Sequence, residues 1–330
     1  MTACEVLVLT TGGTIGSVES LDGLAPLEGA GRSLVRGLGT DGGIVVEELY
    51  ARTSGSIGLS EMASIHQRIV EASGEGFAGV VVTHGTDTLV ETAFVVRLLQ
   101  GNSSFPVVFT GAMRAPGRPG SDALANLGDA VAVAKSVQNV GTGVVIVFDG
   151  GVHSSLRTDK VSSTSMAAFA QSGGGPLGCV IEGRVGVWAI ERFTGLAMGV
   201  DGRVSSSVAL IGALPGDDGS ALLACAEQCA GVVVAGLGGG HVPRQIMDAV
   251  AQVAARKPLM FTTGTTSGGS LRNTYAGPGS EQSLAAVGVI PGWSLGPRKA
   301  ALALSLCLGQ TTDLGRIKEC LTNDMEGLSE

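Results

Sequence analysis

Two threonine-rich turns carry the residue types with which this chain can do chemistry. In VLVLTTGGTIGS, Thr14 follows the pair Gly12-Gly13 at the end of an apolar run. The second turn, in GVVVTHGTDTLVET, follows a run of valines and supplies His84, Thr86, Asp87 and Thr88. Ligands of a parallel α/β sheet bind at the carboxyl ends of its strands, where glycines allow close backbone approach. We therefore expect both turns to belong to one site, together with a lysine-bearing segment further along the chain.

The elements that must position these turns alternate between strand and helix. The valine run 78–85 is unbroken and predicts a strand buried on both faces. Further strands are predicted at residues 5–10, 44–50, 106–111 and 143–150. Helical spacing predicts helices at residues 60–73, with Ser60 as N-cap, 87–100 and 121–136, capped by Ser121 or Asp122. This alternation indicates an α/β fold, a parallel sheet with right-handed crossovers.

The pattern changes after Asp149 and resumes later, which predicts two domains. A polar, hairpin-like segment and a strand at 183–190 follow Asp149, and residues 192–207 have the weak periodicity of a linker. Strands are then predicted at 208–213, 230–240 and 257–264, and helices at 220–228, 243–256 and 296–308. We expect a larger N-terminal α/β domain (1–191), a linker (192–207) and a smaller, Rossmann-like C-terminal domain (208–330).

Composition excludes several classes of partner. The 330 residues carry a net charge of -8 without a concentrated basic patch, which argues against nucleic acid. The apolar stretch that begins at Ala300 has about half the length that a bilayer requires, so no membrane span is expected. The opening MTACEVLVLTTGG lacks the basic region and cleavage site of a secretory signal, and the chain is expected to be cytoplasmic, without disulfides.

Metal and cofactor motifs are weak. Cys225 and Cys229 stand one helical turn apart, but without a histidine pair or a second C-x-x-C they are better explained as core-facing thiols. The segment GLGGG at 236–240 lacks the full dinucleotide motif. The four histidines show no metal-ligand spacing, and His84 is expected to be a structural histidine within its turn. We expect neither metal nor cofactor.

The blocks TTGGTIGS (10–17) and GVVVTHGTDTL (79–89) resemble the two signature motifs of the L-asparaginase/glutaminase family. Similar blocks follow in order through nearly the whole chain: FTGAMR, SDALANLGDAV, TDKVSST, GPLG and SLGPRKA. The HGTDT block is the most specific of them. The resemblance implies a cofactor-free amidohydrolase that converts L-asparagine to L-aspartate and ammonia through a threonine acyl-enzyme, with glutamine as an alternative amide.

The resemblance also implies roles for individual residues. Thr14 matches the threonine that most accounts of the family take as the nucleophile. Thr86, Asp87 and Lys160 match the family's second triad. A lysine desolvated beside a carboxylate can titrate low enough to accept a proton from Thr86, which gives a relay that activates water or protonates the departing ammonia. Which threonine attacks first stays open.

Substrate contacts are implied in the same way. Asp87 would pair with the α-ammonium of an amino-acid amide, and a serine before the second helix would bind its α-carboxylate. Ser56 in RTSGSIGLSEM is the first choice for that serine, and Ser54 is its rival. Backbone N–H groups of the turn from Gly85 to Asp87 would stabilise an oxyanion by about 3–4 kcal/mol per donor.

Members of the family often complete each site with residues of a neighbouring subunit. By spacing to SLGPRKA, Glu281 matches an acidic position that would bind the substrate ammonium in trans. His241 in GLGGGHVP stands where well-known members carry asparagine. The resemblance therefore implies a homodimer or a homotetramer with sites at subunit interfaces.

The segment 17–33 is rich in Gly, Ser and Pro and is expected to be a long loop. It could be a variable surface loop, but because it follows Thr14 we expect it to form a lid over the site. Family members with high asparaginase activity have a lid tyrosine, whereas this chain has only Tyr50 and Tyr275. A related amide, including a D-configured or cyclic one, is therefore an alternative substrate. From another class comes a non-catalytic module that binds acidic amino acids. The intact set Thr14, Thr86, Asp87 and Lys160 favours catalysis.

Overall fold

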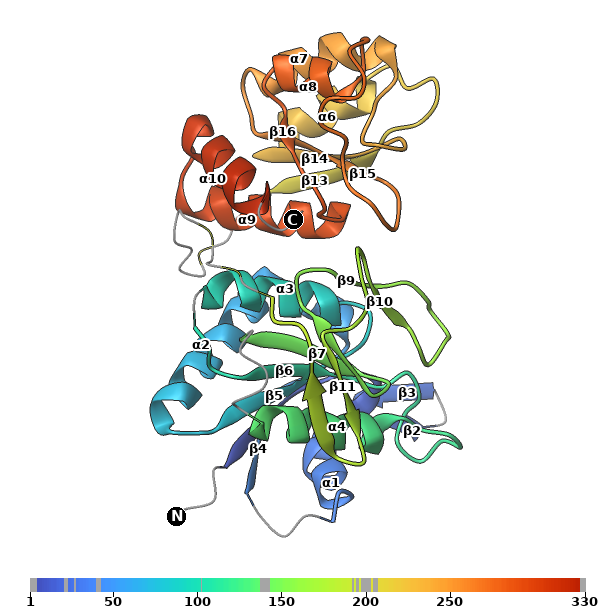
Figure 1. Ribbon diagram of the computed structural model, residues 1–330, viewed down its shortest axis with the longest axis vertical. Coiled ribbons are helices and arrows are strands. Elements are labelled where there is room, and N and C mark those ends of the chain that lie inside the picture. Colours follow the sequence, from blue (N-terminus) through green and yellow to red (C-terminus); the bar gives the residue numbers. More distant parts are fainter. Residues whose placement is uncertain are drawn as a thin grey trace. The chain divides into compact units, whose positions relative to one another are not determined.

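The computed structural model describes residues 5–20, 23–26, 28–39, 43–101, 103–136, 143–191, 193, 196, 203 and 207–326. The chain divides into two compact units, Met1–Phe193 and Thr194–Glu330 (Figure 1). Both units are α/β, and the first is the larger, which confirms the predicted fold class. Most of the predicted linker 192–207 lies outside the described residues.

The first unit is built on an eight-stranded sheet of order β12-β11-β8-β7-β6-β5-β1-β4. The parallel part comprises β1 (Val6–Gly12), β4 (Ile44–Arg52), β5 (Gly79–Thr83), β6 (Val107–Thr110) and β7 (Val144–Phe148). The antiparallel part comprises β8 (Gly151–Ser154), β11 (Gly178–Ile181) and β12 (Arg184–Val187). The direction changes at Asp149-Gly150, where both residues have positive φ, as a tight two-residue hairpin requires.

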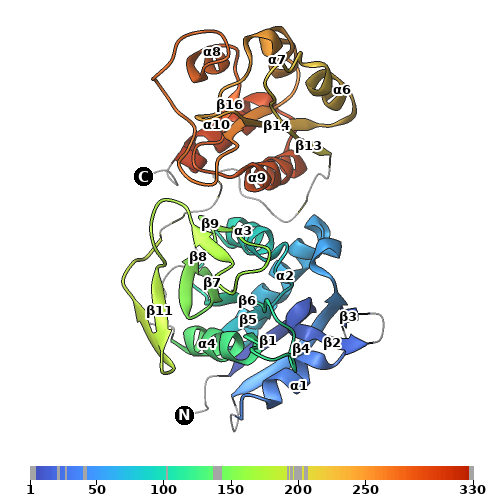
Figure 2. The ribbon, with the colours of Figure 1, turned by 90° about the vertical axis from the view of Figure 1, so that its right-hand side faces the viewer.

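Helices cover both faces of this sheet. Figures 1 and 2 show α1 (Ala30–Arg36) and α4 (Ala123–Lys135) on one face, and α2 (Leu59–Glu75) and α3 (Leu89–Gln100) on the other. Every residue of β5 and β7 is buried, because the apolar side chains of both faces lie beneath helices. The unbroken valine run therefore forms a central strand, as its composition predicted.

Two expectations about local structure were wrong. Helix α2 begins at Leu59 rather than with Ser60 as its N-cap, and the Glu61 carboxylate accepts the Gly58 N–H at 3.1 Å. The Ser60 hydroxyl donates to that same carboxylate at 2.9 Å, so it is not available as a cap. Residues 17–33 are not one long loop, since β2 (Ser17–Ser20) pairs antiparallel with β3 (Gly23–Pro26) and α1 follows. The role of this hairpin as a lid stays a prediction.

The second unit repeats the α/β plan on a smaller sheet. Its four parallel strands, in the order β13-β14-β15-β16, are β13 (Val208–Gly212), β14 (Gly231–Gly236), β15 (Leu259–Thr263) and β16 (Ile290–Pro291). One face carries α6 (Ser220–Gln228), α7 (Met247–Ala254) and α8 (Glu281–Ala286); the other carries α9 (Pro297–Gln310) and α10 (Leu314–Glu326) (Figure 2). Among the described helices of both units, none combines the length and the apolar character needed to cross a membrane.

The turns that leave β1 and β5 are pressed together at two glycines. A Cβ atom on Gly13 would lie 2.2 Å from the Cα atom of Gly85, and one on Gly85 would lie 3.1 Å from the Cα atom of Gly13. Gly13 also has φ 75° and ψ -175°, a backbone region that is almost exclusive to glycine. The Gly13 N–H donates to the Arg52 carbonyl at 2.9 Å, which ties the same turn to the end of β4. The first turn is therefore held between two neighbouring strands.

We predict that Gly13→Ala lowers the free energy of unfolding by about 1–3 kcal/mol. The new Cβ atom would strain the backbone of Gly13 and would collide with the backbone of Gly85. Gly16→Ala is the matched control, since nothing lies within 4 Å of a Cβ atom at that position of the same turn. It should change the free energy of unfolding by less than about 0.5 kcal/mol. Urea unfolding of both variants measures the difference, and equal stability of the two would contradict this account of the contact.

Candidate active site

The register of the parallel sheet brings the two threonine-rich turns to the same edge. Strands β1 and β5 are direct neighbours, and Thr10 pairs with Thr83 at their carboxyl ends. The Thr11 hydroxyl donates to the Thr83 carbonyl at 3.0 Å, which adds a second link between these ends. The chain leaving β1 then reaches Thr14, and the chain leaving β5 reaches Thr86. Together with the Gly13–Gly85 contact, this makes the two turns parts of one surface.

Thr14 opens the short 3-10 turn η1 (Thr14–Gly16) and is half-buried. The next side chain, Ile15, is buried in the hydrophobic core and so fixes the position of the turn. The Ser17 hydroxyl donates to the Gly13 carbonyl at 2.7 Å and closes the turn from the other side. The Thr14 side chain therefore projects from a backbone that is fixed on both sides.

Lys160 joins this edge from a separate strand pair. It ends β9 (Thr158–Lys160), which pairs antiparallel with β10 (Phe169–Gln171). The Lys160 Nζ atom lies 2.9 Å from the Thr86 Oγ1 atom and 2.7 Å from the Asp87 Oδ1 atom. A lysine far along the chain thus makes one hydrogen-bonded group with two residues of the second turn.

The three members of this group differ in exposure. Thr86 is buried, and the Lys160 side chain is only 15% exposed, whereas the Asp87 side chain is 79% exposed. Solvent therefore screens the Lys160–Asp87 ion pair, whose stabilising effect is small. The exposed carboxylate is accessible to a ligand that carries an ammonium group. The shielded Lys160–Thr86 contact is suited to moving a proton between a lysine nitrogen and a hydroxyl oxygen.

His84 stabilises the second turn from inside the protein. Its ring is fully buried, with Nδ1 2.9 Å from the Gly85 carbonyl and Nε2 3.1 Å from the Thr92 hydroxyl. A neutral ring that donates from Nδ1 to the Gly85 carbonyl presents Nε2 to the Thr92 hydroxyl, whose single proton is shared between Nε2 and the Thr88 carbonyl at 2.9 Å. Burial lowers the pKa of His84 to about 4, although the hydrogen bond to Gly85 acts in the opposite direction. The expectation of a satisfied structural histidine is confirmed.

The structure favours Ser54 over Ser56 as the serine beside the site. Both belong to the 3-10 turn η2 (Ser54–Ser56), but Ser54 is buried and Ser56 is exposed. The Ser54 carbonyl accepts the Thr88 hydroxyl at 2.8 Å, and the Ser54 Oγ atom would lie 2.8 Å from a Cβ atom on Gly85. The Ser56 hydroxyl contacts Thr53 instead, at 3.0 Å. The rival of the sequence-based first choice therefore lies against the turn that carries Thr86.

Glu281 and His241 lie together in the second unit. The His241 Nε2 atom is 2.9 Å from the Glu281 Oε2 atom, and the N–H groups of Thr274 and Tyr275 donate to Oε1, each at 2.6 Å. Desolvation alone would raise the pKa of Glu281, but the hydrogen bonds from Tyr275, Thr274 and His241 outweigh it and the pKa is lowered. The carboxylate is therefore anchored within its own chain, and its contact with a neighbouring subunit's substrate stays a prediction.

Two further residues, Asp122 and Asn126, were not identified as site residues from the sequence. The Asp122 carboxylate accepts the N–H groups of Met113 and Arg114, both at 2.9 Å. The Asn126 amide donates to the Gly111 carbonyl at 3.0 Å and to Asp122 at 3.0 Å. They fix the turn after β6, which packs against the turn that carries Thr86. A buried asparagine inside the apolar helix ALANLGDAV was the signal that could have revealed them.

This edge of the sheet combines a fixed threonine, a threonine–lysine pair and an exposed carboxylate. Such a set can transfer an acyl group to a hydroxyl and manage the proton that the hydroxyl loses. In the part of the chain that the structure describes, three or more His, Cys, Asp or Glu side chains nowhere gather as metal ligands would.

The low pKa of His84 predicts a loss of stability in mild acid. The unfolded chain binds a proton near pH 6.5, and the folded state binds it only near pH 4, so stability is complete above pH 6.5 and falls as the pH drops through this window. Between pH 7.5 and pH 5, His84 should account for about 2 kcal/mol of lost unfolding free energy. Urea unfolding of the parent and of His84→Gln at both pH values measures this contribution. The buried His66 and His153 remain in both proteins, so an equal loss in the two would contradict the assignment.

Known proteins resemble this chain along almost its whole length. Residues 5–190 match the family described as asparaginase, N-terminal, and residues 207–321 match the glutaminase/asparaginase C-terminal domain. The L-asparaginase of Bacillus licheniformis is 30% identical over 321 residues, which cover 96% of this chain and 99% of that protein. A glutamyl-tRNA(Gln) amidotransferase component from Aeropyrum pernix is 29% identical over 86% of this chain and 69% of its own length.

Solved structures agree with these sequence matches. The thermostable L-asparaginase from Thermococcus kodakarensis superposes with a TM-score of 0.88 at 28% identity, covering 98% of both chains. The probable cytoplasmic L-asparaginase from Campylobacter jejuni superposes with a TM-score of 0.84 at 26% identity, covering 96% of this chain and 98% of its own. Two family domains in the same order, full-length relatives and a shared two-domain fold lead to one conclusion: the chain belongs to the asparaginase family and is an amidohydrolase.

Proposed function

We propose that this protein hydrolyses the side-chain amide of L-asparagine to L-aspartate and ammonia, with glutamine as a secondary substrate. The observation that carries the proposal is the contact of Lys160 with Thr86 and Asp87 on the surface that also bears Thr14. The similarity to L-asparaginases of two organisms over almost the full chain supports the choice of amide.

The proposed reaction has two steps. The Thr14 oxygen attacks the amide carbon, N–H groups of the turn from Gly85 to Asp87 stabilise the oxyanion, and the C–N bond breaks as ammonia leaves with a proton. Water then attacks the threonine ester, the C–O bond to Thr14 breaks, and the hydroxyl regains its proton. The Thr86–Lys160 pair takes up the proton that the Thr14 hydroxyl loses and gives it to the departing nitrogen; in the second step it takes a proton from the attacking water and returns it to Thr14.

Substrate binding in this proposal relies on two opposite contacts. The exposed Asp87 carboxylate pairs with the α-ammonium group, while its Oδ1 atom keeps the hydrogen bond from Lys160. The Ser54 hydroxyl, which lies against Gly85, binds the α-carboxylate. Both contacts hold the amino-acid part of the substrate, so the side-chain amide is directed towards Thr14. This binding mode excludes simple amides that lack the α-amino acid group.

Removal of either threonine hydroxyl should abolish most of the activity. We expect Thr14→Ala and Thr86→Ala to lower kcat for asparagine by about 1000-fold, since each removes a group that acts on the reacting atoms. Thr53→Ala, at an exposed threonine before η2, is the matched control and should keep the parental kcat. Ammonia release measures all three, and a parental rate in either site variant would refute the mechanism.

The two serines of η2 offer a sharper test of substrate binding. Ser54→Ala should lower kcat/KM for asparagine by about 10- to 100-fold, mainly through KM, because a hydrogen bond to a charged carboxylate is lost. Ser56→Ala should change kcat/KM by less than about twofold, as an exposed surface substitution usually does. The opposite ranking in steady-state kinetics would return the role to Ser56.

The missing lid tyrosine keeps a second candidate function in view. Hydrolysis of a related amide, such as D-asparagine or a small cyclic amide, would use the same threonines with a differently shaped substrate. Some relatives are components of amidotransferases, and this chain spans 61–69% of their length. Kinetic constants for ammonia release from a panel of L-asparagine, L-glutamine, D-asparagine and cyclic amides separate these candidates. A panel without any turnover would instead favour the non-catalytic binding module.

The assembly of the protein also belongs to this proposal. We expect a cytoplasmic homodimer or homotetramer in which Glu281, with His241 beside it, reaches the substrate of a neighbouring subunit. The three hydrogen bonds that Glu281 already accepts would orient its carboxylate for that contact. Neither nucleic acid nor a membrane is expected as a partner, on the grounds of charge and hydropathy.

A further inference from the structure

The strand pair β9 and β10, which carries Lys160, is small and lies outside the eight-stranded sheet. Its strands are joined over three residue pairs, and a two-stranded ribbon of this size has marginal stability by itself. Phe169 of β10 packs edge-on against Phe148 of β7, with the ring centres 4.7 Å apart. The position of Lys160 therefore depends on the contacts that tie this pair to the rest of the unit.

Ser154, at the end of β8, ties both strands of the pair to the sheet. Its Oγ atom accepts the N–H groups of Leu156 and Arg157, each at 3.0 Å, in the turn that leads into β9. Its own N–H group donates to the Gln171 Oε1 atom of β10 at 3.1 Å. Ser154 is fully buried, so these hydrogen bonds are shielded from water. One residue thus fixes the start of β9 and the end of β10 together.

Glu191 completes the contacts of this turn. The Ser154 hydroxyl, which already accepts two hydrogen bonds, donates its single proton to the Glu191 Oε2 atom. The Arg157 Nε atom lies 3.0 Å from the Glu191 Oε1 atom, and the Glu191 side chain is only 9% exposed. Removal of the carboxylate would leave a buried hydroxyl without this acceptor and the Arg157 guanidinium without this counter-ion.

We propose that Glu191 is a positioning residue for Lys160. Arg157 directly precedes β9, which Lys160 ends, so a displacement of the turn moves the lysine with it. The Lys160 Nζ atom lies 2.9 Å from the Thr86 Oγ1 atom and would leave hydrogen-bonding distance after a shift of about 1 Å. This inference rests on the proposed function, in which Lys160 moves protons; Glu191 acts only through β9.

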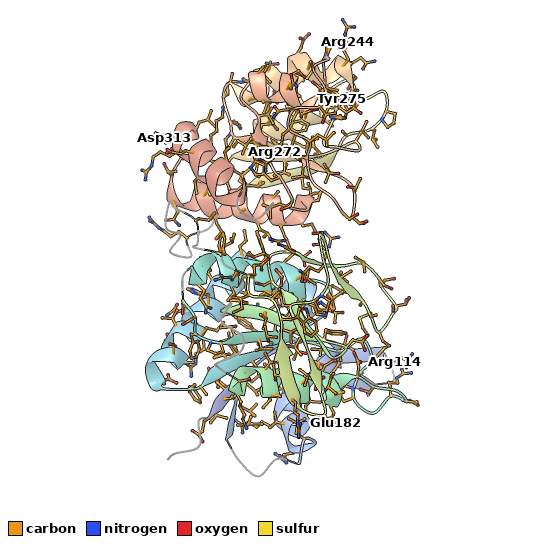
Figure 3. The ribbon with its side chains drawn as sticks, viewed as in Figure 1. Arg114, Glu182, Arg244, Arg272, Tyr275 and Asp313 are labelled. Atoms are coloured by element: carbon orange, nitrogen blue, oxygen red, sulfur yellow. The ribbon has the colours of Figure 1, made fainter. Side chains whose placement is uncertain are left out.

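Steady-state kinetics with asparagine test the effect on the reaction. Glu191→Ala should lower kcat by about 10- to 100-fold and change KM by less than about threefold, because the substrate-binding groups Asp87 and Ser54 do not belong to the pair β9 and β10. Glu191→Gln keeps an oxygen that can accept from Ser154 and should lose less. Glu182→Gln, at an exposed carboxylate of the same unit, is the matched control and should keep the parental kcat (Figure 3).

A double variant tests whether Glu191 acts through Lys160. Lys160→Ala alone should lower kcat strongly. Adding Glu191→Ala should lower it by no more than about a further twofold, since the group that Glu191 positions is already gone. A full additional loss in the double variant would mean that Glu191 supports the site in another way, and it would overturn the proposal.

Chemical labelling of lysines gives a reading that requires no turnover. Reductive methylation with formaldehyde, followed by mass spectrometry of peptides, measures how fast each lysine reacts. Glu191→Ala should raise the rate at Lys160 by about threefold or more, because a lysine released from Thr86 and Asp87 turns towards solvent on its flexible stem. The rate at Lys135, an exposed lysine of α4, should not change.

The labelling result separates this proposal from the proposed hydrolysis. If the parent releases no ammonia but the rate at Lys160 rises as expected, the hydrolysis is refuted and the positioning role is supported. An unchanged rate at Lys160 would overturn the positioning role whatever the activity. Circular dichroism verifies that the variants are folded. If Glu191→Ala does not fold, Glu191→Gln replaces it in each test, and parental kcat together with parental labelling of Lys160 in that variant would overturn the proposal.

Discussion

The close approach between the backbones of Gly13 and Gly85 is the constraint on which the candidate site depends. Neighbouring parallel strands bring the two turns to one edge, but only the absence of both side chains lets the turns touch. Hydrogen bonds from Gly13 to Arg52 and from Thr11 to Thr83 surround this contact. The hydroxyls of Thr14 and Thr86 therefore extend from adjacent, rigid backbones, which is the preorganisation that the proposed covalent catalysis requires.

The lysine of the site arrives by a different route. After β7 the sheet changes from parallel to antiparallel, and the chain then forms the separate pair β9 and β10 that carries Lys160. Lys160 donates to both Thr86 and Asp87, so side-chain hydrogen bonds link the pair β9 and β10 to the turn that follows β5. A rigid pair of turns is thus combined with a lysine, proposed to carry protons, on the separate strand pair β9 and β10.

The carboxylates of Asp87 and Glu281 differ in their exposure to solvent. Asp87 is open to solvent and pairs with Lys160, so a ligand ammonium can approach it with little desolvation. Glu281 is buried and accepts hydrogen bonds from His241, Thr274 and Tyr275, which fix both of its oxygens. Asp87 is thus open to an approaching ligand, whereas the Glu281 carboxylate is held in one orientation.

The sequence by itself determined the alternating α/β plan, the two domains and the family, because valine runs, helical spacing and glycine-threonine turns are local patterns. Only the tertiary structure decided that Ser54 lies against the turn that carries Thr86, that Asn126 braces the turn after β6, and that Gly58 precedes α2. Periodicity describes the regular face of a helix or strand. In irregular segments the direction of a side chain depends on which backbone packs against it, and that neighbour is distant in the sequence.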